Sequence, residues 1–229
     1  MGRRSADPDP WGNAEVPLRV PDIHAYSLET SAALSEYFVP GYIKPLDLIA
    51  VLIGVGVRSV LAGSHGMGGW KQKPRASRDT VLLVGSRNHG KAVRTLVAAY
   101  PHLLAEGNEI GTRLRDPNPA GVVIDVWKPV QPLLHQALVK TRTVHVDGCA
   151  CLIPSLEAAL ALVFDPLTRL DWSSPEKYES AHDFIRIVEC NPDLNLKEVA
   201  ALCELIYEGA GADAAAQVKR LRAGEKLNL

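Results

Sequence analysis

Two apolar segments that each contain a single acid constrain the fold of this chain more than any other feature. Asp79 stands at the start of an aliphatic run that ends at Val84, and Asp125 lies in the middle of the run Gly121 to Trp127. Short aliphatic and β-branched runs of this kind are typical of buried strands. A lone carboxylate inside such a strand costs several kcal/mol unless it is paired or binds a metal. The two acids therefore predict neighbouring strands that share a site.

Length and charge exclude several classes of protein. The chain has 229 residues, 47% of them hydrophobic, which is enough for one substantial core. The 25 basic and 26 acidic side chains leave a net charge of −1, so nothing indicates bulk binding to nucleic acid or to an anionic membrane. The longest apolar stretch, 46–61, is interrupted by charges and glycines and is shorter than the roughly 20 residues that span a bilayer.

The N-terminal sequence and the cysteines indicate a cytoplasmic protein. The basic start at Met1 is not followed by the apolar segment of a secretory signal, so we expect no export. Only two of the cysteines lie close together, with C-x-C spacing, which favours free thiols over a zinc site or a disulfide. The cysteines are Cys149, Cys151, Cys190 and Cys203.

The periodicity of the chain predicts an α/β (α+β) protein: a mixed central sheet with flanking helices, followed by a small C-terminal helical region. Residues 1–22 are predicted to be a mobile tail, 23–150 the α/β domain, and 151–229 a helical region packed on it. The expected strands are 48–53, 79–84, 110–114, 121–127 and 140–146. The expected helices are 27–38, a helix that begins within 57–62, and then 89–100, 156–164, 176–188 and 196–207. The glycine-rich stretch 63–74 is expected to be a long, basic, flexible loop.

The order of three motifs resembles a known family. These are the strand and glycine turn Leu52–Gly56, the segment Arg75–Val81, and the acid-bearing strand Val123–Val126. This order is similar to that of the nucleotidyltransferase fold of polymerase-β-like enzymes, in particular the bacterial branch that includes the abortive-infection AbiE-type toxins. The resemblance covers about residues 46–190, including two trailing helices around 154–160 and 177–184.

The resemblance implies transfer of a nucleoside monophosphate from an NTP to a hydroxyl group on RNA, a protein or a small molecule, with Mg²⁺ or Mn²⁺ as cofactor. Asp79 and Asp125 would be the catalytic and metal-binding residues, Asp125 holding a second metal or acting as base. An antitoxin-like protein partner is also implied. The implied nucleotide-binding residues are Gly54, Gly56, Ser64, Lys73, Arg75, Arg78 and Lys177.

The chain departs from the family pattern at two places. The family carries a second acid two residues after the first, where this chain has Val81. The turn is also altered, and either Gly54-Val55-Gly56 or Gly63-Ser64 could correspond to it; the first is preferred because 48–53 is the better apolar run. Two alternatives stay open: a non-catalytic relative that binds a nucleotide or a protein, and a scaffold in which Asp125 merely pairs with Arg75 or Arg58.

Overall fold

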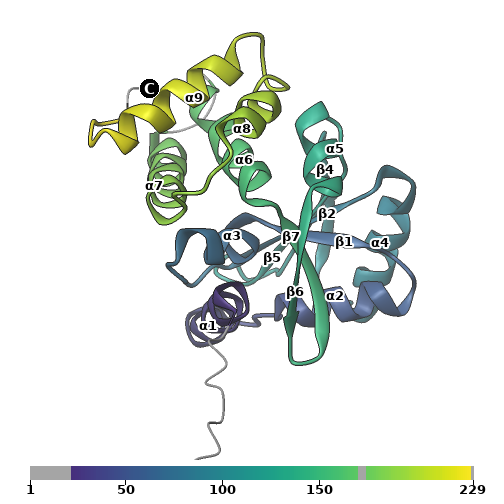
Figure 1. Cartoon of the computed structure of the whole chain (residues 1–229). Helices are drawn as coiled ribbons and strands as arrows, with labels where there is room; N and C mark the ends of the chain where they lie inside the picture. The colour runs from purple at the N-terminus through teal and green to yellow at the C-terminus, as the bar shows by residue number, and fades with distance from the viewer. Residues whose placement is uncertain (1–21, 170–173, 228–229) are drawn as a thin grey trace, which may run out of the picture.

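The computed structural model describes residues 22–169 and 174–227, and a seven-stranded mixed sheet forms its centre (Figure 1). The predicted tail, except for Asp22, lies outside the described residues. The order across the sheet is β3-β4-β5-β2-β1-β7-β6. The strands are β1 (Ser59–Ala62), β2 (Asp79–Val84), β3 (Leu104–Gly107), β4 (Gly111–Arg115), β5 (Val123–Trp127), β6 (Thr141–Val146) and β7 (Cys149–Pro154).

Helices surround this sheet. They are α1 (Ile23–Phe38), α2 (Pro45–Gly54), α3 (Gly63–Lys71), α4 (Ser86–Ala99), α5 (Pro132–Val139), α6 (Leu156–Thr168), α7 (Ser174–Cys190), α8 (Leu196–Cys203) and α9 (Ala210–Arg222). In Figure 1, α2 and α4 lie on one side of the sheet, and α7, α8 and α9 are grouped on the other. The predicted fold class is confirmed.

The strand pairing explains why the sheet is mixed. β2 runs parallel to β5 and β1 runs parallel to β7, whereas the other neighbouring strands are antiparallel. The predicted hairpin is present as β4 and β5. The predicted strand at 140–146 is β6 at one edge of the sheet, joined to β7 through a tight turn with positive φ at Asp147 and Gly148.

Two apolar layers hold the elements in place. Leu82, Ile124 and Val126 point to the face covered by α2 and α4 and belong to the main core. A second core lies within the helical region, where Phe164 of α6 packs 5.8 Å from Phe184 of α7 between ring centroids. A smaller cluster around Leu83 joins α5 to the opposite face of the sheet.

The segment predicted as a strand at 48–53 is instead part of α2, and this prediction was wrong. The buried positions are Pro45, Leu48, Ile49 and Leu52, which is the i, i+3, i+4, i+7 spacing of one helical face. Pro45 in the first turn and Asp47 behind it are both favourable at a helix start. The helix expected to begin within 57–62 is in turn the strand β1.

The glycine-rich stretch expected to be a loop begins with the helix α3, and its glycines let α3 lie unusually close to its neighbours. A Cβ atom at Gly66 would be 1.9 Å from the carbonyl oxygen of Leu61, and one at Gly69 would be 2.1 Å from His24 Nδ1 on α1. Only glycine allows this approach. The composition that disfavours a helix in isolation is therefore required by the packing of this helix.

The boundaries of the C-terminal part differ slightly from the prediction. Ser155 caps α6 by accepting a hydrogen bond from the Ala158 N–H at 3.3 Å, and Asn195 caps α8 in the same way. The predicted boundary after residue 150 falls inside β7, which pairs with β1 and β6, so the sheet extends to Pro154. Within the described residues, no helix is long and apolar enough to cross a bilayer.

Candidate functional site

The two acids singled out from the sequence lie on neighbouring parallel strands, as predicted. The register places Asp79 opposite Val123 and Val81 opposite Asp125. Residues two apart on a strand share a face, and directly opposite residues do so as well, so Asp79, Val81 and Asp125 all lie on one face of the sheet. Asp125 therefore neighbours Val81 directly, and Asp79 diagonally.

Asp125 is held by an arginine of the adjacent antiparallel strand. Arg113 Nε donates to Asp125 Oδ1 at 2.8 Å and Arg113 Nη2 donates to Oδ2 at 2.9 Å. The Asp125 side chain is 7% exposed and the Arg113 side chain is 51% exposed. The hydrogen bond to Asp125 raises the pKa of Arg113 above its usual value. The open alternative of an Asp125–arginine pair is thus realised, with Arg113 in place of Arg75 or Arg58.

The register extends this pair into a row across the sheet. Arg113, Asp125, Val81 and Ala62 stand directly opposite one another on four consecutive strands. Val81 is 8% exposed, and a Cβ atom placed on Gly63 would lie 3.0 Å from its Cγ2 atom. Val81 therefore packs tightly beneath Gly63 and fills the place next to Asp125 with methyl groups.

A cavity of about 410 Å³ opens beside this row. It lies between the start of β2, the N-terminus of α3, and the helices α6 and α7. We call it the cleft. Residues that line it and bear on its chemistry are Gly63, Ser64, Arg75, Ser77, Asp79, Val81, Trp127, Glu179 and Asp183.

The turn beside Asp79 is Gly63-Ser64, whereas the Gly54-Val55-Gly56 turn of the preferred alignment is not at the cleft. Gly63 directly follows β1 with φ of +63° and begins α3. Gly54 ends α2, and Gly56 precedes the Ser59 end of β1, which pairs with Val84 at the far end of β2 from Asp79. Gly54 and Gly56 therefore lie away from the cleft, because a whole strand separates them from it.

The N-terminus of α3 has no side-chain cap among the described residues. The first N–H groups of a helix have no partner within the helix and carry a partial positive charge. Ser64 in this first turn accepts a hydrogen bond from Arg75 Nη2 at 2.7 Å. The cleft thus combines backbone donors, a hydroxyl group and a guanidinium group, which are the groups that bind phosphate oxygens.

Asp79 lines the cleft, and half of its side chain is exposed. Burial raises the pKa of its carboxyl group, the Arg78 guanidinium lowers it, and the negative charge of Asp125 raises it again, so that the pKa lies above its usual value. Arg78 Nε is 3.4 Å from Asp79 Oδ1, and Arg78 Nη1 donates to the Pro119 carbonyl oxygen at 3.0 Å. Arg78 is therefore oriented by Asp79 and by the loop before β5.

The other predicted binding residues divide into those near the cleft and those that are not. Arg75 reaches the cleft, where it also forms an ion pair with Glu179. Lys73 lines a smaller adjoining cavity of about 180 Å³ together with Lys71 and Asp183. Lys177 is half-buried on α7 and is not among the residues lining either cavity.

Two further residues of the site were not predicted as site residues. Glu179 pairs with Arg75 across the cleft, and its position on α7 gives no signal in the sequence. Arg113 does leave a signal, because the predicted hairpin of 110–114 with 121–127 can bring an arginine opposite Asp125. Arg113 is identified only by the exact pairing of β4 with β5, and the residue pattern does not predict that register.

The carboxylates of the site do not fit a pair of divalent metal ions. Each acid that lines the cleft has its own cation: Asp79 with Arg78, Glu179 with Arg75, and Asp183 with Lys71; Asp125, in the row beside the cleft, is paired with Arg113. Among the described residues, no group of three His, Cys, Asp or Glu side chains could hold a metal ion. Mg²⁺ needs several oxygen ligands in near-octahedral geometry, and Val81, which lies beside both acids, offers no oxygen atom.

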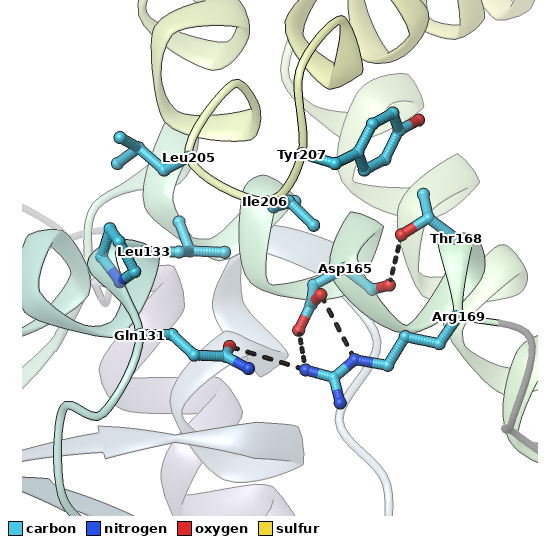
Figure 2. A pocket seen from close by; sticks show the side chains of 9 residues that line it. Gln131, Leu133, Asp165, Thr168, Arg169, Leu205, Ile206 and Tyr207 are labelled. Atoms are coloured by element: carbon cyan, nitrogen blue, oxygen red, sulfur yellow. Dashed lines mark hydrogen bonds and ion pairs between the residues drawn. The ribbon is translucent and has the colours of Figure 1, made fainter.

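A second cavity, of about 350 Å³, lies between α5, the end of α6 and the segment that joins α8 to α9 (Figure 2). Arg169 Nη2 donates to Asp165 Oδ2 at 2.9 Å and to Gln131 Oε1 at 3.5 Å on its floor. Leu205, Ile206 and Tyr207 form the opposite wall in Figure 2. It contains no residue that the sequence singled out.

Comparison with known proteins shows a likeness of structure only. No protein-family model matches the chain, and no curated protein sequence matches it. An antigenic nucleotidyltransferase-like protein from Paracoccidioides brasiliensis has a similar structure, with a TM-score of 0.51 and 16% identity over 86% of this chain and 95% of that one. The antibiotic-resistance factor ANT(2'')-Ia in solution gives a TM-score of 0.49 at 14% identity over 78% of this chain and 94% of that one. The chain has the fold of a nucleotidyltransferase-like protein.

Proposed function

We propose that this protein binds a nucleoside triphosphate in the cleft without transferring a nucleoside monophosphate from it in a reaction that needs two metal ions. The observation that carries the proposal is the placement of Gly63-Ser64, the uncapped N-terminus of α3 and Arg75 at an open cavity of about 410 Å³. A cavity of this size is in the usual range for a small-molecule site. The fold supports a nucleotide as the class of ligand.

The proposed binding mode assigns a role to each group. The N–H groups at the start of α3 and the Ser64 hydroxyl contact a phosphate group, and Arg75 neutralises its charge after releasing Glu179. Trp127, which lines the same cavity, offers an aromatic surface for the base or the sugar. Val81 and the Asp125–Arg113 pair make the transfer reaction the less favoured function, because they remove the ligands that two metal ions would need.

Calorimetric titration with ATP, GTP, CTP and UTP tests this proposal, in Mg²⁺, in Mn²⁺ and in EDTA. We expect one of the four to bind, and Ser64→Ala or Arg75→Gln to weaken binding by about tenfold, the usual effect of losing a hydrogen bond to a charged group. Gly54→Ala is the matched control, since a Cβ atom there meets nothing within 4 Å and the position is remote from the cleft. Absence of binding to all four, or equal loss in Gly54→Ala, would contradict the proposal.

The second candidate is the predicted transfer of a nucleoside monophosphate to a hydroxyl acceptor. The position of Asp79 favours it, since this carboxylate lines the cleft and its raised pKa suits a group that accepts a proton. Incubation with an α-³²P-labelled NTP and total cell RNA, protein and metabolites tests it. Label transfer that disappears in Asp79→Asn would establish this function. The AbiE-type branch and an antitoxin-like partner stay predictions from the sequence.

A further inference from the structure

We infer that Arg113 is a built-in cation that replaces a divalent metal ion at Asp125, so that the cleft works without metal. This inference deepens the proposed function and rests on it for the identity of the ligand. Its physical basis is the two parallel hydrogen bonds, at 2.8 and 2.9 Å, by which Arg113 occupies both carboxylate oxygens of Asp125. A metal ion at Asp125 would need the same oxygen atoms.

Asp125 and Arg113 differ in their exposure to solvent. Asp125 is buried, whereas half of the Arg113 side chain is exposed on the same face of the sheet as Asp79. A guanidinium group has five N–H donors, and two of them are used on Asp125. The remaining three have no hydrogen-bond partner among the described residues and are oriented by Asp125, in the row beside the cleft rather than in its lining.

The neighbours of Arg113 leave its charge available to a ligand. Glu106 stands opposite Arg113 on β3, but Glu106 Oε1 accepts a hydrogen bond from Arg115 Nε at 2.6 Å. The charges of Asp79 and Glu106 also raise the pKa of Arg113, but Arg78 already pairs with Asp79. Arg113 therefore forms hydrogen bonds with one acid, Asp125. It also lies close enough to Asp79 for its charge to lower the pKa of Asp79.

The packing explains why the arginine is favoured over a metal ion at this place. A guanidinium group is charged at every physiological pH and matches a carboxylate with two parallel bonds. Val81, on the other side of Asp125, offers no oxygen ligand and is locked beneath Gly63. While Arg113 occupies both oxygen atoms of Asp125, Val81 supplies no other oxygen, so the pair is complete without a metal ion.

Thermal unfolding with Mn²⁺ or Mg²⁺ alone tests the inference without any nucleotide. We expect the Tm of the unaltered protein to be the same in EDTA and in either metal. Arg113→Gln leaves Asp125 buried without its cation; we expect a lower Tm in EDTA and a Tm that rises with Mn²⁺ concentration. Arg113→Gln combined with Asp125→Asn removes the unpaired charge, and we expect it to fold and to lose the response to Mn²⁺.

Two results would overturn the inference. One is a metal-dependent Tm of the unaltered protein that disappears in Asp125→Asn. The other is a folded Arg113→Gln protein without any response to metal. If that variant does not fold, Arg113→Lys still keeps a cation at Asp125, and a Tm of Arg113→Lys that rises steeply with Mn²⁺ would contradict the inference. We expect Arg113→Lys to bind Mn²⁺ more weakly than Arg113→Gln does.

Nucleotide titration separates this inference from the proposed function. If the cleft binds an NTP, the inference requires the same Kd in Mg²⁺ and in EDTA, and an increase of about tenfold in Arg113→Gln measured in EDTA. If no NTP binds, the proposed function fails, while the metal response of Arg113→Gln still decides whether Arg113 occupies a metal position. NTP binding that is lost in EDTA would contradict the inference and leave the proposed function standing.

Discussion

Val81 is the residue that most affects whether the cleft can bind a metal ion. It stands next to Asp125, lies on the same face as Asp79, and presents only methyl groups to both acids. Val81→Asp adds a third carboxylate to this corner, which costs about 2–4 kcal/mol of folding free energy if no cation joins it. We expect a lower Tm in EDTA, recovery in Mg²⁺ or Mn²⁺, and NTP binding that depends on the metal.

The control for this prediction is Val81→Asn, which has nearly the same shape as Asp but no charge. We expect it to lower the Tm equally in EDTA and in Mg²⁺. A folded Val81→Asp protein that gains no affinity for metal would show that the cleft does not have the geometry of a metal-dependent enzyme site.

His65, at the start of α3, predicts a dependence of stability on pH. Burial is the main cause that lowers its pKa from 6.5 to about 4, with the charges of Arg75 and Lys71 acting in the same direction and a backbone hydrogen bond to Ser77 opposing them. The folded state therefore keeps His65 neutral where the unfolded state binds a proton. The free energy of unfolding is therefore not reduced by His65 above pH 6.5. As the pH falls toward 4, protonation of His65 in the unfolded state lowers the free energy of unfolding by at most about 3 kcal/mol.

Urea unfolding at several pH values between 7.5 and 4.5 measures this effect. His65→Gln cannot titrate and can still form a hydrogen bond with the Tyr42 hydroxyl group, which lies 3.3 Å from His65 Nε2. We expect the free energy of unfolding of His65→Gln to fall less steeply below pH 6.5 than that of the parent. Parallel curves for the two proteins would show that His65 is not the group responsible.

At the scale of residues, the sequence predicts some members of the site and not others. The buried acid at 125 could be recognised, because an acid in an apolar run is a local feature; that Val81 stands in place of a second acid stays a prediction from the resemblance. The partner of Asp125 could not, because Arg113 becomes a neighbour only through the exact pairing of β4 with β5. A shift of one residue would turn it to the other face.

At the scale of elements, the contact between α1 and α3 depends on glycines. A Cβ atom at Gly69 would meet His24 Nδ1 at 2.1 Å, and one at Gly68 would meet Ser27 Oγ at 2.5 Å. Helix propensity favours alanine over glycine by about 1 kcal/mol, but here the overlap outweighs it. We expect Gly69→Ala to lower the free energy of unfolding by about 1–3 kcal/mol in urea denaturation.

The control for this prediction is Gly90→Ala in α4. A Cβ atom there meets only Arg94 Nη1, at 3.4 Å, and the end of an arginine side chain can move aside. The higher helix propensity of alanine then dominates, and we expect the free energy of unfolding to increase by about 0.5–1 kcal/mol. A gain at both positions would mean that α1 does not pack against α3 as the structure describes.

Elements were predictable from the sequence where pattern and propensity agree. The strands β2 and β5 and the capped helix α6 were expected correctly, since their residues favour the observed state. The exchange of helix and strand between 48 and 62 arose because α2 is almost wholly aliphatic, and a short apolar run does not distinguish a buried helix from a strand. The helix α3 was missed because its glycines disfavour a helix until α1 and β1 are packed against it.

At the scale of the whole molecule, a buried ion pair joins the sheet layer to the helical region. Lys71 Nζ at the end of α3 lies 2.8 Å from Asp183 Oδ2 on α7, and their side chains are 3% and 14% exposed. Burial lowers the pKa of Lys71, and the nearby charge of Asp183 opposes this shift. Asn191 Nδ2 donates to the Trp70 carbonyl oxygen at 2.8 Å beside it. These polar contacts fix how α7 lies against α3.

Removing one partner of this pair leaves the other charged and buried, whereas removing both does not. We therefore expect Asp183→Asn to lower the free energy of unfolding by about 3–5 kcal/mol, and Lys71→Met with Asp183→Leu to restore most of it. Hydrogen exchange locates the effect: if the pair joins the two regions, amides of α7 exchange faster in Asp183→Asn while those of β2 change less. Negligible loss in both the single and the double variant would mean that the helical region is held to the sheet by its apolar contacts, such as those of Met67 and Trp70 with the second core, and that the ion pair is dispensable.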